Sequence, residues 1–392
     1  MFRIGKEEID AVTRVIQSRS LFRVNDSLKE VDNFERELKE KIGVNYALCL
    51  AGGTSALIAA LVGAGIGPGD EVIVPGYTFM ASASAVLAAG AIPVIAEIDE
   101  TLTISPEDVK NKITPHTKAI IPVHILGYPC NMEKLCNIAK EHNLKIIEDA
   151  CQADGGSYKG KRHGNWGDAG AFSFNHFKII SAGEGGAVVT NDRTIYERAL
   201  VFHDGGASFR PYAGELTIPV FIGSQFRVSE VTGSILREQL KRLDGILQDL
   251  RNVKKRFIEA LSTVQGIAFT PSNDSEGDCA IVIGFAFESE EKAREFAKSE
   301  GVEGWLPIDS GKHVYANWEP VLSKRGAHHP DINPFNLTQN KNLNMEYSKD
   351  MCPKTLSILS RTVNVGLSPD WTEEEIEQKI GACKKAVSSM KS

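Results

Sequence analysis

The chain is expected to adopt an α/β fold with a mostly parallel central sheet, followed by a smaller α+β domain. Three observations predict this. Its 392 residues exceed the size at which one hydrophobic core usually stops growing. Short apolar segments alternate with helical ones in the first half of the chain, which is typical of a parallel sheet covered on both faces. After a long charged helix near residue 240, the alternation gives way to an α+β pattern.

The first half of the chain opens with two amphipathic segments, Ile9–Ile16 and Val31–Ile42, that predict helices. Strands and helices are then expected to alternate. The strands are predicted at Tyr46–Leu50, Glu71–Pro75, Ile92–Ala96, Lys118–Val123, Lys145–Asp149 and Gly186–Thr190. The helices between them are predicted at Ala56–Gly63, Met80–Ala89 and Met132–His142.

The second half opens with a long charged helix over Ser229–Asp249. A strand follows at Cys279–Phe287, and Ser289 is a suitable cap for a helix that runs to about residue 300. The segment 313–353 is expected to be loop-rich, and 372–390 to be helical. We place the domain boundary near residue 245, which divides the chain into a large domain at 1–245 and a small one at 246–392. The N-terminal helix is a candidate to pack on the small domain.

Composition narrows the class of protein. The formal net charge is −7 and the pI about 5.8, with basic residues scattered, which argues against a nucleic-acid partner. The apolar-rich region 51–96 is interrupted by Gly67–Glu71, so no membrane span is expected. The acidic, amphipathic start does not resemble a secretory signal, and a cytoplasmic protein is expected. Seven widely spaced cysteines without a CxxC pair predict neither disulfides nor a metal site.

Ligands of open α/β sheets bind beyond the carboxyl ends of the strands. Two candidate features lie there. Gly52–Ser55 leads from a strand directly into a helix, where free backbone N–H groups and two hydroxyls suit an anion, although an ordinary capped turn has the same pattern. Glu148 and Asp149 end another strand and alternate faces, so at most one of them points into a given pocket. There a carboxylate would pair with a cation such as a protonated pyridine nitrogen, or cap the next turn.

Two further features follow strands. Lys178 lies in an apolar setting before the glycine-rich turn Gly183–Gly186. Such a lysine is either solvated or has a lowered pKa that makes it nucleophilic toward an aldehyde. Phe79, in the segment 75–79, is a candidate to stack on a flat heteroaromatic ligand, although a core position is the better explanation of this residue taken alone.

Taken together, these features resemble the DegT/DnrJ/EryC1/StrS family of aminotransferases, and the resemblance covers nearly the whole chain. It rests on the order and spacing of several motifs, which are Gly53–Leu57, Gly67–Pro75, Glu148–Gln152, Ser173–Phe174 with Lys178, and Gly183–Gly186. The resemblance implies the aspartate aminotransferase-like fold type I of pyridoxal 5'-phosphate (PLP) enzymes and a homodimer with composite active sites. It also implies transfer of an amino group from an amino acid, glutamate by the same resemblance, to a keto-sugar, a nucleotide-linked keto-sugar or a keto-cyclitol.

The resemblance also implies roles for individual residues. Lys178 is similar to the Schiff-base lysine that also shuttles a proton, and Asp149 to the carboxylate paired with the pyridinium nitrogen. The remaining cofactor-binding residues implied are Gln152 at the ring hydroxyl, Phe79 on the ring face, and Thr54, Ser55 and Ser173 at the phosphate. Pyridoxamine 5'-phosphate is the expected intermediate form of the cofactor.

The chain departs from the family pattern at three positions. Gln225, in the segment 223–227, stands where an asparagine usually reaches the phosphate of the neighbouring subunit. Cys151 and Asp154 replace the usual alanine and histidine, which bears on local packing and not on the reaction.

Two alternative functions are weighed against the aminotransferase. A related PLP- or pyridoxamine-phosphate-dependent sugar dehydratase would carry histidine in place of Lys178. A non-catalytic cofactor-binding regulator would not need lysine, aspartate and glutamine together. The acceptor stays open, because the basic and aromatic side chains of 313–330 suit a sugar as well as a plain structural role.

Overall fold

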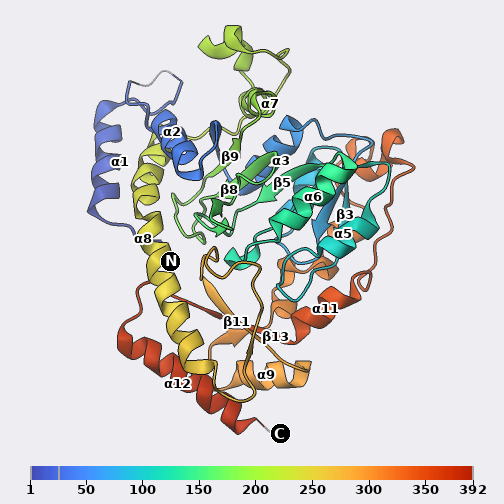
Figure 1. The fold of residues 1–392 in the computed structure, drawn as a ribbon. Helices are drawn as coiled ribbons and strands as arrows, with labels where there is room; N and C mark the ends of the chain where they lie inside the picture. The colour runs from blue at the N-terminus through green and yellow to red at the C-terminus, as the bar shows by residue number, and fades with distance from the viewer. Residues whose placement is uncertain (1, 25–26, 391–392) are drawn as a thin grey trace.

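The computed structural model describes residues 2–24 and 27–390, and its centre is a seven-stranded sheet (Figure 1). The strand order is β1–β9–β8–β5–β4–β2–β3. The strands are β1 (Tyr46–Leu50), β2 (Glu71–Pro75), β3 (Ile92–Ala96), β4 (Thr117–Ile120), β5 (Lys145–Asp149), β8 (Ala169–Ser173) and β9 (Gly186–Thr190). Neighbours from β3 to β8 are parallel, whereas β9 is antiparallel to β8 and β1. The predicted mostly parallel sheet is confirmed.

Helices cover both faces of this sheet. They are α3 (Gly53–Gly63), α4 (Ala81–Ala88), α5 (Pro106–Lys112), α6 (Met132–His142) and α7 (Arg193–His203). Strand side chains alternate between two buried clusters: Val72 and Val74 join the cluster on the α3 and α7 side, and Ile73 joins the one under α5 and α6. A two-stranded hairpin, β6 (Ser157–Tyr158) and β7 (Lys161–Arg162), precedes β8.

The sequence pattern did not predict α5, α7 and β8. For α5 and α7 the start signals were present, because Ser105 and Asp192 cap them by accepting backbone N–H groups of the first turn. For β8 the reason is composition. Its residues Ala-Gly-Ala-Phe-Ser include no β-branched side chain, and the strand forms between β5 and β9 because that position is fully buried.

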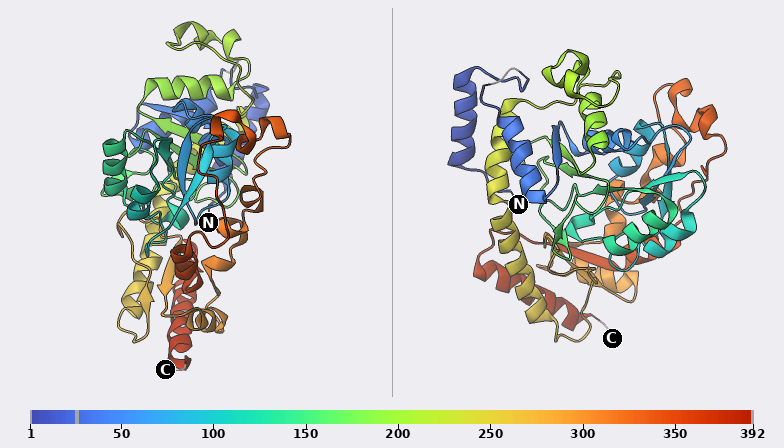
Figure 2. Two further views of the ribbon diagram at one scale, coloured as in Figure 1. Left: turned by 90° about the vertical axis from the view of Figure 1, so that its right-hand side faces the viewer. Right: turned by 45° about the horizontal axis from the view of Figure 1, so that its top comes forward.

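A second, antiparallel sheet lies below the first (Figures 1 and 2). Its order is β10–β11–β13–β12, with β10 (Ala268–Phe269), β11 (Val282–Ala286), β12 (Gly304–Trp305) and β13 (Thr362–Gly366). Helices α9 (Glu290–Lys298) and α12 (Glu373–Ser389) pack beside it. The predicted strand 279–287 is shorter than expected, because Ala280 adopts a left-handed backbone with φ +59°.

The segment 307–351 is loop-rich, as predicted, and consists mainly of single turns. The helical pieces here and elsewhere are η1 (Ile125–Gly127), η2 (Ala207–Phe209), η3 (Pro211–Glu215), η4 (Pro307–Asp309), η5 (Gly311–His313), η6 (Tyr315–Asn317), η7 (Pro330–Ile332), η8 (Pro334–Asn336), η9 (Thr338–Asn340), α10 (Glu319–Leu322) and α11 (Pro353–Ser360). Among the described residues, no helix combines the length and apolar character needed to span a bilayer.

The two sheets are connected by α8 (Glu230–Leu261), a single helix of 32 residues. It continues 12 residues beyond the predicted end at 249, and residue 245 lies inside it, so the division at 245 stays a prediction. Helices α1 (Lys6–Ser18) and α2 (Glu30–Ile42) pack along α8 (Figure 1). Just before α1, Arg3 donates hydrogen bonds to Asp249 and Asp370, which connects the N-terminus to the C-terminal part of the chain.

The crossing of α2 and α8 depends on one glycine. A Cβ on Gly233 would lie 2.7 Å from the backbone nitrogen of Val31, whereas a Cβ on Gly245 of the same helix would meet nothing within 4 Å. Alanine favours a helix over glycine by roughly 0.5–1 kcal/mol. At Gly233 the steric cost of roughly 1–3 kcal/mol is expected to exceed that gain.

We therefore expect Gly233→Ala to lower the thermal unfolding midpoint and Gly245→Ala to leave it unchanged or raise it, as measured by circular dichroism. Equal midpoints for the two variants would contradict this account of the crossing.

Candidate active site

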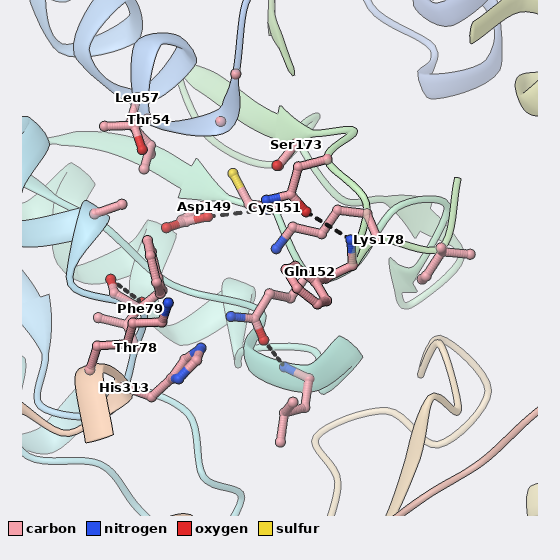
Figure 3. Close-up of a pocket in the computed structure, with 18 of the residues that line it drawn as sticks. Thr54, Leu57, Thr78, Phe79, Asp149, Cys151, Gln152, Ser173, Lys178 and His313 are labelled. Atoms are coloured by element: carbon pink, nitrogen blue, oxygen red, sulfur yellow. Dashed lines mark hydrogen bonds between the residues drawn. The ribbon is translucent and has the colours of Figure 1, made fainter. Parts of the chain in front are cut away.

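A cavity of about 950 Å³ lies where the carboxyl ends of β5 and β8 meet the start of α3. The second sheet closes it through Val282, Trp305 and Leu367. All but one of the predicted site residues line it, namely Thr54, Ser55, Phe79, Asp149, Gln152, Ser173 and Lys178. The exception is Gln225. Figure 3 shows Asp149 and Lys178 on opposite sides of the cavity, Thr54 and Ser173 above, and Phe79 and His313 below.

The start of α3 forms one wall of the cavity. Its first N–H groups have no acceptor within the helix, and the Ser55 hydroxyl donates to the carbonyl of Gly52 at 2.7 Å. A Cβ on Gly53 would lie 2.7 Å from the Cβ of Ser173 and 2.9 Å from the Sγ of Cys151. Only glycine therefore lets the helix start approach β8 this closely. The result is a cradle of backbone donors that suits a phosphate.

Asp149 is the buried carboxylate of the cavity. Its residue is 5% exposed, and its Oδ2 accepts the Ser82 hydroxyl at 2.7 Å while Oδ1 accepts the backbone N–H of Cys151 at 3.1 Å. The Ser82 hydroxyl is in turn 2.8 Å from that of Thr78. A carboxylate offers about four lone-pair sites. Asp149 is therefore held in place and still has acceptor capacity for a donor inside the cavity.

Glu148 points to the other side of β5, as the alternation of strand side chains requires. Its Oε1 accepts the N–H groups of Trp166 and Gly167, both at 2.7 Å, and its Oε2 accepts the N–H of Gly164 at 2.9 Å. The Nδ1 of His124 accepts the N–H of Cys130, so its Nε2 carries the hydrogen and donates to Glu148 at 3.2 Å.

His163 stacks on His124, and the ligand-type atoms of His124, Glu148 and His163 lie within 4.8 Å of one another. The oxygens of Glu148 are already occupied by four donors, which are the three backbone N–H groups of the 164–167 turn and the Nε2 of His124. The cluster is therefore built as a hydrogen-bonded anchor for the 163–167 turn.

Lys178 lies in a tight turn after β8. Its backbone N–H donates to the carbonyl of Asn175 at 3.1 Å, and the N–H of Phe177 donates to the Asn175 side chain at 3.0 Å. The ammonium group has no hydrogen-bond or ion-pair partner within 2–24 and 27–390. It is thus the one unpaired amine that faces Asp149 across the cavity among the site residues that the sequence predicted (Figure 3).

Gln152 is oriented by a strained residue. Its Oε1 accepts the N–H of Leu126 at 3.1 Å, and Leu126 has a left-handed backbone with φ +51°. Such a conformation costs a non-glycine residue roughly 1–2 kcal/mol. Because the carbonyl oxygen is occupied, the amide nitrogen of Gln152 is left to donate into the cavity. The strained backbone of Leu126 therefore places the N–H group that orients the Gln152 amide.

Gln225 lies outside this cavity and is exposed. Its side-chain oxygen accepts the N–H of Arg227 at 2.6 Å. Arg227 and Arg210 both pair with the buried carboxylate of Asp204, and both guanidinium groups lie over the ring of Phe22. The backbone of this segment still adjoins the site, since the N–H of Ala51 donates to the carbonyl of Phe226 at 2.8 Å.

The two other departures from the family pattern lie at the site: Asp154 is buried, and Cys151 is partly buried and lines the cavity. The Sγ of Cys151 donates to the carbonyl of Ala171 at 3.7 Å. Burial raises the pKa of Asp154 well above its ordinary value, against the opposing charge of Lys178, and both of its oxygens lack a hydrogen-bond partner in the described part of the chain. Burial therefore favours the neutral form of Asp154, and the effect of both positions on local packing stays a prediction.

Sequence reasoning missed several lining residues. Ser82, which holds Asp149, sits on an apolar helix and carries no signal of its own. Trp305, Val282 and Leu367 come from the second sheet, and only the tertiary arrangement brings them to the cavity. Lys312 was also missed, although its neighbour His313 was noted.

The fold and the cavity together define a PLP-binding enzyme of the aminotransferase class, and comparison with known proteins supports this. Residues 3–304 match the model of the DegT/DnrJ/EryC1/StrS aminotransferase family. Because that match covers well over half of the chain, this protein belongs to the DegT/DnrJ/EryC1/StrS aminotransferase family. Members of the family depend on PLP, so the predicted family, enzyme class and cofactor are confirmed.

The relatives include GDP-perosamine synthase of Escherichia coli O157:H7, which is 41% identical over 239 residues. That match spans 60% of this chain and 64% of the enzyme, slightly less than two thirds of its length. The spore coat polysaccharide biosynthesis protein SpsC of Bacillus subtilis (strain 168) is 30% identical over 98% of this chain and 95% of its own. The X-ray structure of the aminotransferase from Psychrobacter cryohalolentis superposes with a TM-score of 0.81, at 27% identity, over 98% of both chains.

The residues present fit the cofactor of this family. The backbone donors at the start of α3 suit its phosphate, because a Cβ at Gly53 would close their approach to Ser173. Asp149 keeps free acceptor capacity for a pyridinium N–H, and Lys178 offers an unpaired amine. Phe79 lies at the cavity wall below Asp149 and offers an aromatic surface (Figure 3).

The anchor at Glu148 generates a prediction about stability. In Glu148→Gln an amide nitrogen, which cannot accept a hydrogen bond, replaces one of two oxygens that both face N–H donors, so at least one donor loses its acceptor. We expect the free energy of unfolding to fall by about 2 kcal/mol or more, measured by urea denaturation.

Glu133→Gln is the control, because Glu133 forms an exposed ion pair with Lys159, and such pairs contribute roughly 0–1 kcal/mol. If Glu148→Gln were as stable as this control, the anchor would not have the importance we assign to it.

Proposed function

We propose that this protein moves an amino group from an amino acid, L-glutamate, to a keto-sugar, a nucleotide-linked keto-sugar or a keto-cyclitol, with Lys178 and Asp149 as the catalytic residues. The observation that carries the proposal is that one cavity holds, on opposite sides, the unpaired amine of Lys178 and the hydrogen-bonded carboxylate of Asp149. When bound, PLP supplies an electron-accepting ring that stabilises negative charge at the substrate carbon.

Lys178 would hold the cofactor through a Schiff base at Nζ and, once released, act as the base that moves the proton at the substrate carbon. A base must lie within reach of the proton that it removes and must not be tied to another acid. The turn at Asn175 fixes the backbone of Lys178, while its amine has no competing ion pair among the described residues.

Asp149 would accept the pyridinium N–H and keep the ring positively charged. Ser82 and the Cys151 N–H each take one lone-pair site of its carboxylate, so the remaining sites face the cavity. Because this carboxylate is already fixed, it would stabilise a positive charge on the ring nitrogen without reorganising.

The remaining residues would bind and orient the cofactor. Thr54, Ser55 and Ser173, together with the start of α3, would hold its phosphate. Phe79 would cover one face of the ring, and the amide nitrogen of Gln152 would donate to the ring hydroxyl. Gln225 lies outside its own cavity, and we propose that it reaches the phosphate of a second copy in a homodimer with composite sites.

The proposed function generates a prediction about Lys178. Reduction of the holoenzyme with borohydride, followed by peptide mass mapping, is expected to label Lys178. In Lys178→Ala we expect the label and the visible absorbance of the bound cofactor to disappear and turnover to be lost. A label on Lys312, the other lysine that lines the cavity, would contradict the assignment.

The second prediction concerns Asp149. Asp149→Asn removes the charge opposite the ring nitrogen and is expected to lower the rate of the glutamate half-reaction roughly 10²-fold or more, measured by stopped-flow absorbance. Asp168→Asn is the matched control, because Asp168 pairs with Lys145 at the opposite end of β8. A wild-type rate in Asp149→Asn would argue against the proposed role.

A further inference from the structure

Two basic residues enter the cavity from the segment that connects β12 to β13 of the second sheet. Lys312 and His313 line the cavity below Phe79. The ammonium group of Lys312 lies 5.0 Å from the centroid of the Phe79 ring, and the His313 ring lies 5.4 Å from it. The proposed function assigns no role to either residue.

The backbone of this segment is held firmly. The carbonyl of Lys312 accepts the N–H of Met80 at 3.1 Å and the indole N–H of Trp318 at 2.9 Å, and Trp318 is fully buried. The carbonyl of His313 accepts the N–H of Thr78 at 2.9 Å. Both side chains are therefore presented to the cavity by a fixed backbone that is hydrogen-bonded to the 77–80 segment.

Lys312 brings a positive charge that no carboxylate within the described residues neutralises, and its ammonium group lies over the face of the Phe79 ring. Two acids of the described residues line the cavity: Asp149 accepts hydrogen bonds from Ser82 and from the Cys151 N–H, and Glu184 lies in the exposed glycine-rich turn. Apolar residues such as Val282, Trp305 and Leu367 form much of the remaining wall. A spare ammonium beside an apolar wall favours a ligand that carries negative charge.

His313 presents a different group. Its Nδ1 lies 3.3 Å from the carbonyl of Ser310, which can only accept, so Nδ1 carries the hydrogen and Nε2 is left as an acceptor. Burial lowers the pKa of His313 below its ordinary value, and the charges of Lys178 and Lys312 act in the same direction, against that hydrogen bond. A neutral ring with a free acceptor nitrogen suits a hydroxyl group.

We propose that Lys312 binds an oxyanion of the sugar acceptor, a carboxylate or a phosphate, while His313 accepts a hydrogen bond from one of its hydroxyls. The acceptor class is thus an acidic, polyhydroxylated carbonyl compound. This inference rests on the proposed function. Because the amino donor passes through the same cavity and also carries carboxylates, its test must separate the two half-reactions.

The test uses the holoenzyme and its Lys312→Met variant. Glucuronate, glucose 1-phosphate and glucose are titrated as a carboxylate, a phosphate and a neutral probe, and binding is followed through the absorbance of the bound cofactor. We expect at least one acidic probe to bind the wild type roughly tenfold more tightly than glucose, with the preference lost in Lys312→Met. The probe that responds identifies the acidic group.

Two controls complete the design. Lys341→Met removes an exposed lysine of the same loop-rich segment that does not line the cavity, and it should keep the preference. Lys312→Arg should retain most of it, because the charge remains. Equal binding of acidic probes by wild type and Lys312→Met, or equal weakening of glucose, would overturn the inference.

The glutamate half-reaction is measured in the same variants. A rate in Lys312→Met within about threefold of the wild type supports a subsite for the acceptor. A large loss with unchanged binding of the acidic probes would assign Lys312 to the donor and overturn the inference. Borohydride labelling of Lys178 in every variant keeps the two proposals distinct, because a missing label defeats the proposed function, whereas intact labelling with unaffected probe binding defeats this inference alone.

Discussion

The site depends on the alternation of side chains at the carboxyl end of β5. Successive residues of a strand point to opposite faces, so Glu148 and Asp149 cannot serve the same environment. Glu148 is held by three backbone N–H groups and His124, which fixes the 163–167 turn beneath the sheet. Asp149 is then directed into the cavity and braced by Ser82. One acid anchors the strand end, and its neighbour is available for chemistry.

The rest of the cavity is arranged around that fixed carboxylate. The start of α3 approaches β8 closely because position 53 has no side chain. The turn after β8 brings Lys178 to the opposite side, and the left-handed Leu126 orients Gln152. Strain and close packing therefore lie next to the candidate site, where the surrounding structure can hold them. Polar groups converge from segments far apart in the chain, and the apolar second sheet covers them.

Much of this fold follows from local pattern. Apolar strands of four to five residues, glycine at Gly53 and the acid pair at the end of β5 are readable directly, since they reflect burial and alternation within a few residues. The elements that were missed lacked such a pattern or depended on neighbours. The strand β8 has a composition poor in β-formers, and α8 continues past residue 249 because α12 packs against its later turns.

The amino-acid sequence by itself determined the fold class, the family, the cofactor and the identity of the residues at the strand ends, because short motifs encode local geometry. Only the tertiary structure showed that Ser82 holds Asp149, that Gln225 lies outside its own cavity, and that Lys312 stands beside Phe79. The physical reason is distance along the chain. Contacts between residues 79 and 312 arise from packing of whole layers, which no local periodicity records.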